Sequence, residues 1–236
     1  MKKLLLISNS TNAGEKYLEY PKPYIKDFLK DSVKNILFIP YAAADFSYDE
    51  YEEMVATQFS TIGYNIQSIH KFENPIEAVK NAEAIAVGGG NTFHLLNELQ
   101  KNNLIEPIYK KVTEGMPYIG WSAGSNVASP TIKTTNDMPI IEPDSFKAFN
   151  LIPFQINPHY LDANPNGHAG ETREMRISEF IYVNRDIYVA GLREGTMFRI
   201  EGENMSLLGN KSMRLFKYNQ DPKEYSSDDN LNFLLK

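Results

Sequence analysis

The stretch Pro117-Tyr118-Ile119-Gly120-Trp121-Ser122-Ala123-Gly124-Ser125-Asn126 contains a short apolar run that leads into Gly-x-Ser-x-Gly. Such a run is typical of a buried strand, and the residues after the serine can turn into a helix. Strand, tight turn and helix in this order form the layout of a nucleophile elbow. Gly120 and Gly124 lack the Cβ atoms that would crowd the turn. The motif therefore predicts an exposed hydroxyl at Ser122.

The same turn offers a place for negative charge. The N–H of Ala123 would lie at a helix N-terminus and point into the space beside the Ser122 hydroxyl, where negative charge is favoured. A tetrahedral oxyanion fits such a site, so the first hypothesis is a serine hydrolase. Because Gly-x-Ser-x-Gly is short and both residue types are common in loops, this hypothesis needs support from the rest of the chain.

Strand-like apolar runs alternate with helical segments along the chain. Strands are predicted over residues 4–7, 35–42, 64–69, 84–87, 118–121, 187–191, 197–201, 204–208 and 213–217. Helices are predicted over residues 49–62, 75–80, 93–100 and 171–182. This alternation predicts one α/β domain over residues 1–236, with a largely parallel sheet and helices on both faces.

Two further regions complete this prediction. The last three strands are joined by short turns, and we expect them to form an antiparallel edge near the C-terminus. Residues 129–166 are rich in Pro, Asn and Asp, and they are predicted to form a long irregular loop of functional importance. The polar residues 219–230 are predicted to lie on the surface.

The composition excludes several classes of function. The chain has 236 residues, no cysteine and a formal net charge of −6. It therefore has no disulfide, thiolate metal site or cysteine nucleophile, and it lacks the basic excess of a general nucleic-acid binder. No apolar run reaches 18 residues, so we expect no membrane span. Residues 1–8 resemble a buried strand more than a signal peptide, and we expect a cytoplasmic protein.

A serine nucleophile needs a base, usually histidine, and the histidine needs a carboxylate to orient it. The chain has four histidines, namely His70, His94, His159 and His168. His159 follows an apolar segment, and sites in open α/β sheets gather at the carboxyl ends of strands. On position alone His159 ranks first, and His168, in a glycine-containing loop, ranks second.

Two acids compete to orient the histidine. Asp137 lies in the polar segment 134–139, and Glu194 follows a predicted strand directly. A triple glycine, Gly88-Gly89-Gly90, follows the predicted strand 84–87 and allows the backbone to approach a ligand closely. One of its N–H groups is a candidate second oxyanion donor opposite Ala123. A phosphate loop is the alternative, but the spaced glycines and the Gly-Lys-Ser/Thr of nucleotide-binding motifs are absent.

Six motifs, taken together and in order, resemble those of the peptidase E family. They are Gly88-Gly89-Gly90-Asn91-Thr92-Phe93, Gly120–Asn126, Thr134–Pro139, Asn157-Pro158-His159-Tyr160, Gly170–Glu174 and Gly191–Gly195. The family consists of α-aspartyl dipeptidases, which are serine peptidases related in fold to class I glutamine amidotransferases. The resemblance covers most of the chain.

This resemblance implies cleavage of dipeptides with N-terminal aspartate, Asp-Xaa. It implies Ser122 as nucleophile, His159 as base and the amides of Gly90 and Ala123 as oxyanion donors. It leaves the choice between Asp137 and Glu194 open. A small peptide is the expected partner, and neither a metal ion nor an organic cofactor is required.

A substrate of this kind carries an ammonium group and two carboxylates. Because the protein is acidic, it must supply cations locally, and Arg173 is the candidate for holding the aspartate side chain bidentately. Asn91, or the acid that does not orient the histidine, is a candidate for the ammonium group. Further substrate contacts are expected from Thr92 and Tyr160.

Three alternatives remain open at this point. The order Ser122, Asp137, His159 also matches an α/β-hydrolase esterase, although the histidine lies unusually far from the C-terminus for that fold. A cyanophycin-type peptidase would act on aspartyl backbones of a polymer. An inert binding module of amidotransferase-like fold would hold an acidic ligand without turnover. The oligomeric state does not follow from the sequence.

Overall fold

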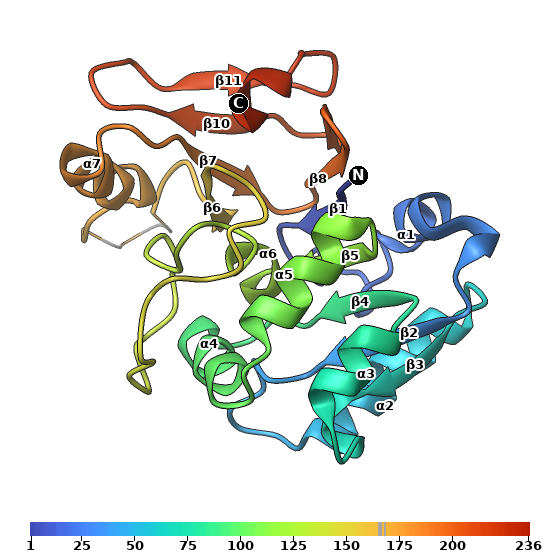
Figure 1. Cartoon of the computed structure of the whole chain (residues 1–236). Helices are drawn as coiled ribbons and strands as arrows, with labels where there is room; N and C mark the ends of the chain where they lie inside the picture. The colour runs from blue at the N-terminus through green and yellow to red at the C-terminus, as the bar shows by residue number, and fades with distance from the viewer. Residues whose placement is uncertain (165–166, 168) are drawn as a thin grey trace.

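The computed structural model describes residues 1–164, 167 and 169–236, and its strands form two sheets (Figure 1). In this described part, the larger sheet contains, in spatial order, β3 (Asn65–Ser68), β2 (Asn35–Ile39), β4 (Ala84–Val87), β5 (Pro117–Trp121), β1 (Lys3–Ile7), β8 (Met197–Glu201) and β9 (Asn204–Leu208). The smaller sheet contains β11 (Lys223–Tyr225), β10 (Met213–Phe216), β7 (Val189–Arg193) and β6 (Gln155–Tyr160).

The larger sheet is mostly parallel. The strands from β3 to β1 all run in the same direction, and β8 and β9 add an antiparallel edge. This confirms the predicted fold class, a largely parallel sheet with antiparallel edge strands near the C-terminus.

The expectation that the last three strands share one edge is wrong for β10. This strand pairs with β7 and β11 in the smaller sheet, in which β6 and β7 are parallel to each other. The partner strand β6 lies inside residues 129–166, which were predicted to be irregular, and β11 lies inside the polar segment 219–230. Both carry too weak an alternation of apolar residues to be recognised alone, and pairing with neighbouring strands makes them extended.

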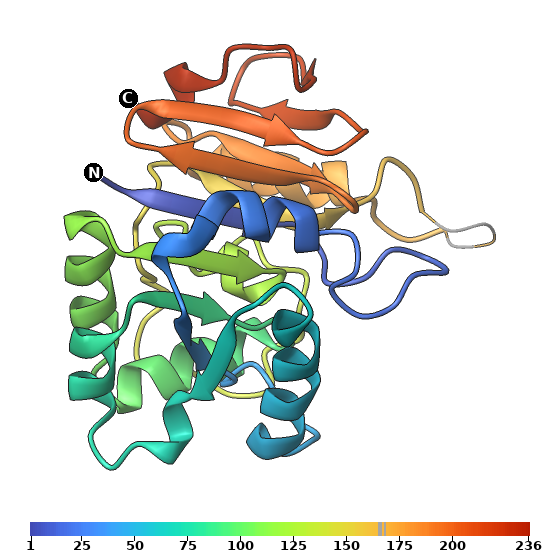
Figure 2. The same ribbon diagram turned by 90° about the vertical axis from the view of Figure 1, so that its right-hand side faces the viewer.

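Helices cover both faces of the larger sheet, as Figures 1 and 2 show. One face packs against α1 (Lys22–Leu29) and α2 (Tyr48–Ser60), and the other against α3 (Pro75–Asn81), α4 (Thr92–Lys101), α5 (Ile105–Glu114) and α6 (Ala123–Asn126). Successive residues of a strand point to opposite faces of the sheet. In β1, Leu5 therefore packs in the core beneath α1 and α2, and Leu4 and Leu6 pack in the core beneath α3 to α6. The helix α7 (Arg173–Val183) packs on the smaller sheet.

Local signals explain where several helices begin. Ser47 and Glu50 form a reciprocal capping box at the start of α2, and Asn74 caps α3, whose first residue is Pro75. The helices α1 and α5 were not predicted. The remaining short helical turns are η1 (Lys30–Ser32), η2 (Ile69–Lys71) and η3 (Asn232–Leu235). Across the described residues, no helix combines the length and apolar character needed to cross a bilayer.

Candidate active site

The turn between β5 and α6 has the geometry of a nucleophile elbow. Ser122 adopts φ 54° and ψ −112°, a backbone conformation that residues other than glycine rarely adopt. A Cβ on Gly120 would lie 2.3 Å from the Gly124 carbonyl oxygen, and one on Gly124 would lie 2.1 Å from the Val87 carbonyl oxygen. Both positions therefore require glycine, because a larger residue at position 120 would push α6 away from β5, and one at position 124 would push α6 away from β4.

A serine, a histidine and a glutamate from three separate chain segments are joined by hydrogen bonds. The Nε2 atom of His159 lies 2.9 Å from the Ser122 hydroxyl, and its Nδ1 atom lies 2.7 Å from a carboxylate oxygen of Glu194. Ser122 follows β5, His159 lies near the end of β6, and Glu194 follows β7. An imidazole held between a hydroxyl and a carboxylate can accept the hydroxyl proton, and the carboxylate fixes its tautomer.

His159 is an extra residue in its strand. Pro158 pairs with Leu192 and Tyr160 pairs with Arg193, so His159 bulges out of the ladder between β6 and β7 with φ 53°. The bulge turns the imidazole toward Ser122 at the cost of backbone strain and of a local break in the ladder.

Buried polar groups compensate for this bulge. The Ser8 hydroxyl accepts the His159 N–H at 3.0 Å and donates to the Leu192 carbonyl at 2.7 Å, so one oxygen links β6 to β7 across the bulge. The Asn136 side chain donates to the Pro158 carbonyl at 2.7 Å. Ser8 is completely buried at the end of β1.

The loop that carries Glu194 is also braced. The side chain of Asn9, the residue after Ser8, accepts the Gly195 N–H at 2.8 Å and the Tyr20 hydroxyl at 2.7 Å. The end of β1 therefore supports both the histidine and the glutamate, although neither Ser8 nor Asn9 is among the site residues predicted from the sequence. The signal that could have identified them is a polar pair directly after a buried parallel strand.

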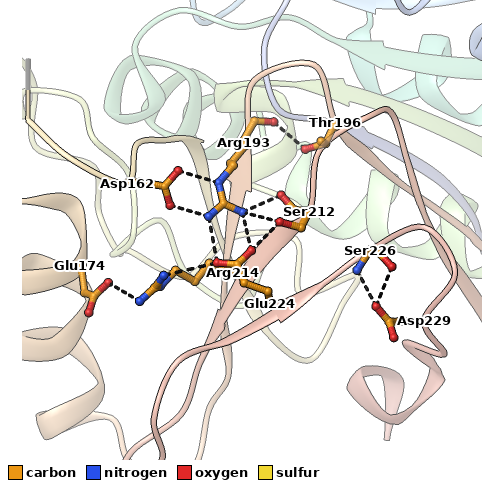
Figure 3. Close-up of polar contacts among 9 residues, drawn as sticks. All are labelled: Asp162, Glu174, Arg193, Thr196, Ser212, Arg214, Glu224, Ser226 and Asp229. Atoms are coloured by element: carbon orange, nitrogen blue, oxygen red, sulfur yellow. Dashed lines mark hydrogen bonds and ion pairs between the residues drawn. The ribbon is translucent and has the colours of Figure 1, made fainter.

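Arg193, the last residue of β7, contacts both Asp162, which follows β6, and Glu224 in β11 (Figure 3). Its guanidinium donates twice to Asp162 and twice to Glu224, and it also reaches the backbone and side chain of Ser212. Hydrogen bonds from Arg193 hold the pKa of both carboxyl groups, Asp162 and Glu224, below their usual ranges. Since Asp162 follows the His159 strand, this network fixes the strand end relative to the Glu194 loop.

Asp137, the second candidate acid, occupies a different place in the same pocket. One of its oxygens, Oδ2, accepts hydrogen bonds from the Thr92 N–H at 2.8 Å, from the Thr92 hydroxyl and from the Thr135 hydroxyl at 3.0 Å. Within the described residues no hydrogen bond joins Asp137 to His159, and Oδ1 accepts none. The structure thus brings Glu194, and not Asp137, to the imidazole.

A cavity of about 390 Å³ opens beside the Ser122 hydroxyl. Its lining includes Thr92, Asp137, His159, Arg173 and Glu194. Partial burial lowers the pKa of the Arg173 guanidinium, with Arg176 acting in the same direction and Asp137 opposing it. Among the residues that the structure describes, Arg173 has no hydrogen-bond or ion-pair partner, so it offers an unpaired positive charge to the pocket.

The two amides expected to bind an oxyanion are available. Ala123 is the first residue of α6, where backbone N–H groups lack intrahelical acceptors. Gly90 lies between β4 and α4, with φ 137°, and its N–H has no acceptor within the described residues. In the part of the chain that the structure describes, neither amide donates a hydrogen bond to another group of the protein.

Some predicted residues lie elsewhere. Asn91 caps α4 by accepting the His94 N–H and donates to the Met138 carbonyl, so both ends of its amide are used within the protein. Tyr160 is 2% exposed and packs against α7 in the smaller sheet, because the side chain after His159 points to the opposite face. The structure therefore does not bring Tyr160 into the pocket as expected. His168 lies outside the described residues.

One group of side chains has ligand atoms spaced closely enough for a metal ion in the described part of the chain. It consists of Asp49, Glu52 and His70. The Lys71 ammonium forms ion pairs with both carboxylates and already supplies a positive charge there. None of these residues lines the pocket beside Ser122.

Comparisons with known proteins identify the family of the chain. The model of peptidase family S51 matches residues 4–208. Peptidase E of Nostoc sp. is 57% identical over 235 residues, which cover 100% of this chain and 97% of that protein. Peptidase E of Shewanella oneidensis is 46% identical over 232 residues, covering 98% of both chains.

A solved structure resembles the whole fold. The crystal structure of a peptidase from an acI-B1 actinobacterium has a TM-score of 0.71 and 18% sequence identity, and the match covers 98% of this chain and 96% of that one. At this identity the likeness concerns the fold alone. The family-model match and the full-length relatives establish the family: the chain belongs to peptidase family S51.

Proposed function

We propose that this protein is a serine-type dipeptidase that hydrolyses dipeptides with N-terminal aspartate. In the first half-reaction His159 takes the proton of Ser122, whose oxygen attacks the aspartyl carbonyl carbon. His159 then passes the proton to the leaving amine, and an ester with Ser122 remains. In the second half-reaction water attacks this ester while His159 removes a proton from the water. His159 then gives that proton to the Ser122 oxygen as its bond to the acyl carbon breaks, so that aspartate is released and the free serine is restored.

The contact between Glu194 and the imidazole supports assigning the orienting role to Glu194. A carboxylate 2.7 Å from Nδ1 keeps that nitrogen protonated, so that Nε2 is free to accept the proton of Ser122. The N–H groups of Gly90 and Ala123 would stabilise the negative oxygen of each tetrahedral intermediate.

The charges in the pocket support an aspartyl substrate, and the observation that carries this proposal is that Arg173 has no hydrogen-bond or ion-pair partner among the described residues. A guanidinium without a partner can hold a side-chain carboxylate bidentately, and in a half-buried place this interaction is strong. The free Oδ1 of Asp137 would hold the substrate ammonium group. A free ammonium would then be required for binding, which restricts the enzyme to the N-terminal residue. The names of the relatives, Peptidase E, agree with a peptidase.

The test compares four substrates with the purified protein in the presence of a chelator. Asp-Leu should be cleaved, whereas Leu-Leu lacks the carboxylate, N-acetyl-Asp-Leu lacks the ammonium group, and Asn-Leu is an isosteric neutral control. Ser122→Ala should abolish all cleavage. Turnover of esters or of an aspartyl polymer without Asp-Leu cleavage would contradict the proposal, and binding of Asp-Leu without product would indicate an inert module.

The role of Arg173 is tested by replacing it with methionine, which retains much of the length but not the charge. We expect kcat/KM for Asp-Leu to fall about 100-fold or more, because the substrate carboxylate would be left half-buried without its partner. The ratio of Asp-Leu to Asn-Leu turnover should fall by a similar factor. An unchanged ratio would assign the recognition of aspartate to another residue.

A further inference from the structure

A buried tyrosine on α2 connects the two loops that would stabilise the oxyanion. The Tyr51 hydroxyl donates to the Gly89 carbonyl at 2.8 Å. The indole N–H of Trp121, the residue before Ser122, donates to the hydroxyls of Tyr17 at 3.1 Å and Tyr51 at 3.3 Å. Tyr51 therefore contacts the triple-glycine loop after β4 and the elbow after β5 with one oxygen atom.

The Gly89 carbonyl and the Gly90 N–H belong to the same peptide group. In a trans peptide these two bonds point in opposite directions, so fixing the carbonyl also fixes the direction of the N–H. Because both residues are glycine, no side chain opposes rotation of this peptide plane. The hydrogen bond from Tyr51 is the contact that holds the Gly89 carbonyl toward α2.

We propose that Tyr51 is a positioning residue for the oxyanion-binding amide of Gly90. It anchors the Gly89–Gly90 peptide so that the Gly90 N–H stays on the opposite side, free for the substrate. This inference deepens the proposed function, because it rests on Gly90 acting as an oxyanion donor to the intermediate formed on Ser122.

The triple-glycine loop packs closely against both Tyr51 and Ser122. A Cβ on Gly88 would lie 2.5 Å from the Tyr51 hydroxyl, and a Cβ on Gly89 would lie 3.0 Å from the Ser122 Cβ. The glycine loop thus lies directly between Tyr51 and the nucleophile. Tyr51 is 2% exposed, and burial raises its pKa to about 12, so its hydroxyl remains a neutral donor at the pH of the reaction.

The variant Tyr51→Phe removes only the hydroxyl, and Tyr17→Phe is the matched control. Tyr17 belongs to the same hydrogen-bonded group and bonds to Trp121 and Tyr51, but in the described part of the chain no hydrogen bond joins it to Gly89. For Asp-Leu we expect kcat to fall about tenfold in Tyr51→Phe with KM within twofold, less than the roughly 100- to 1000-fold loss when an oxyanion donor is removed outright. Tyr17→Phe should stay within about twofold of the unmutated protein in both constants.

A second readout does not depend on the peptide substrate. A fluorophosphonate reacts with an activated serine: the Ser122 oxygen bonds to phosphorus, fluoride leaves, and the phosphonyl oxygen occupies the oxyanion position. Labelling should slow in Tyr51→Phe by about the same factor as kcat, and not in Tyr17→Phe. If the unmutated protein is labelled but does not cleave Asp-Leu, slower labelling of Tyr51→Phe still supports the inference, and only the proposed substrate fails.

Three results would overturn the inference. One is a Tyr51→Phe variant with unchanged kcat and labelling rate, and another is an equal loss in Tyr17→Phe. The third applies even if Tyr51→Phe does not fold. In a crystal structure of the phosphonylated, unmutated protein, the phosphonyl oxygen should accept the Gly90 N–H while the Gly89 carbonyl remains bonded to Tyr51. A rotated peptide, or an oxygen bound elsewhere, would exclude the role.

Discussion

Replacing Ser8 by alanine removes a single oxygen that fills a gap in the ladder between β6 and β7. The Ser8 hydroxyl accepts the His159 N–H at 3.0 Å and donates to the Leu192 carbonyl at 2.7 Å, and its site is completely buried. Each buried group left unpaired costs about 1–3 kcal/mol. With both groups affected, and with some relaxation of the bulge, we expect the free energy of unfolding to fall by about 3 kcal/mol.

The same change should reduce catalysis beyond its effect on stability. His159 holds φ 53° only while its neighbours enforce it, and relaxation would move the imidazole away from Ser122. A misplacement of about 1 Å costs about 100-fold in rate, so we expect kcat for Asp-Leu to fall by about 10- to 100-fold with a smaller change in KM. Steady-state kinetics well below the melting temperature, together with urea unfolding, measure the two effects separately.

Ser129→Ala is the matched control. Ser129 is equally buried and accepts the Ile156 N–H at 3.1 Å, near the opposite end of the same strand from His159. Loss of the Ser129 hydroxyl should lower the free energy of unfolding by about 1–3 kcal/mol and leave kcat within about twofold of that of the unmutated protein. If Ser8→Ala is destabilised but retains the kcat of the unmutated protein, Ser8 does not hold the bulge in its active geometry, and the reasoning fails.

Three further predictions concern the surrounding structure. Glu194→Gln should lower kcat by about 100- to 10,000-fold, because the amide no longer fixes the imidazole tautomer; activity close to that of the unmutated protein would refute the role proposed for Glu194. Gly124→Ala should lower the free energy of unfolding by about 3 kcal/mol, since its Cβ would lie 2.1 Å from the Val87 carbonyl oxygen; calorimetry would measure the loss. Glu224→Gln should cost up to about 1 kcal/mol at pH 7, because the ion pair with Arg193 is half-exposed. Since hydrogen bonds from Arg193 lower the pKa of Glu224 in the folded state, this difference should be complete above the ordinary glutamate pKa of about 4.3, decline below it, and disappear as the pH falls through the lowered folded-state pKa; a difference that persists in stronger acid would exclude the ion pair as its source.

The central fold follows from local sequence signals. The apolar run before Ser122 and the glycines around it predicted β5 and the elbow, and the glycines are required by contacts of 2.3 and 2.1 Å. The runs that became β1 and β4 are short and apolar because parallel strands are buried on both faces. Signals of this kind depend on neighbouring residues in the chain, and they can be read without knowledge of the tertiary structure.

The smaller sheet could not be predicted in the same way. Its strand β6 lies within a segment rich in Pro and Asn, and β11 within a polar segment, so neither shows a clear strand pattern. They are extended because β7 and β10 offer open edges for pairing. The sequence identified His159 by its position after an apolar run, but it gave no indication that this residue is a bulge.

The sequence alone determined the fold class, the elbow serine, and a short list of histidines and acids that could act with it. Only the tertiary structure separated Glu194 from Asp137, because both follow plausible patterns and the choice depends on which carboxylate reaches Nδ1 of His159. The same holds for Ser8 and Tyr51, whose hydroxyls contact residues 151 and 38 positions away in the chain. A contact between distant residues leaves no local pattern, since it arises when strands and helices pack, and that packing fixes the geometry of the site.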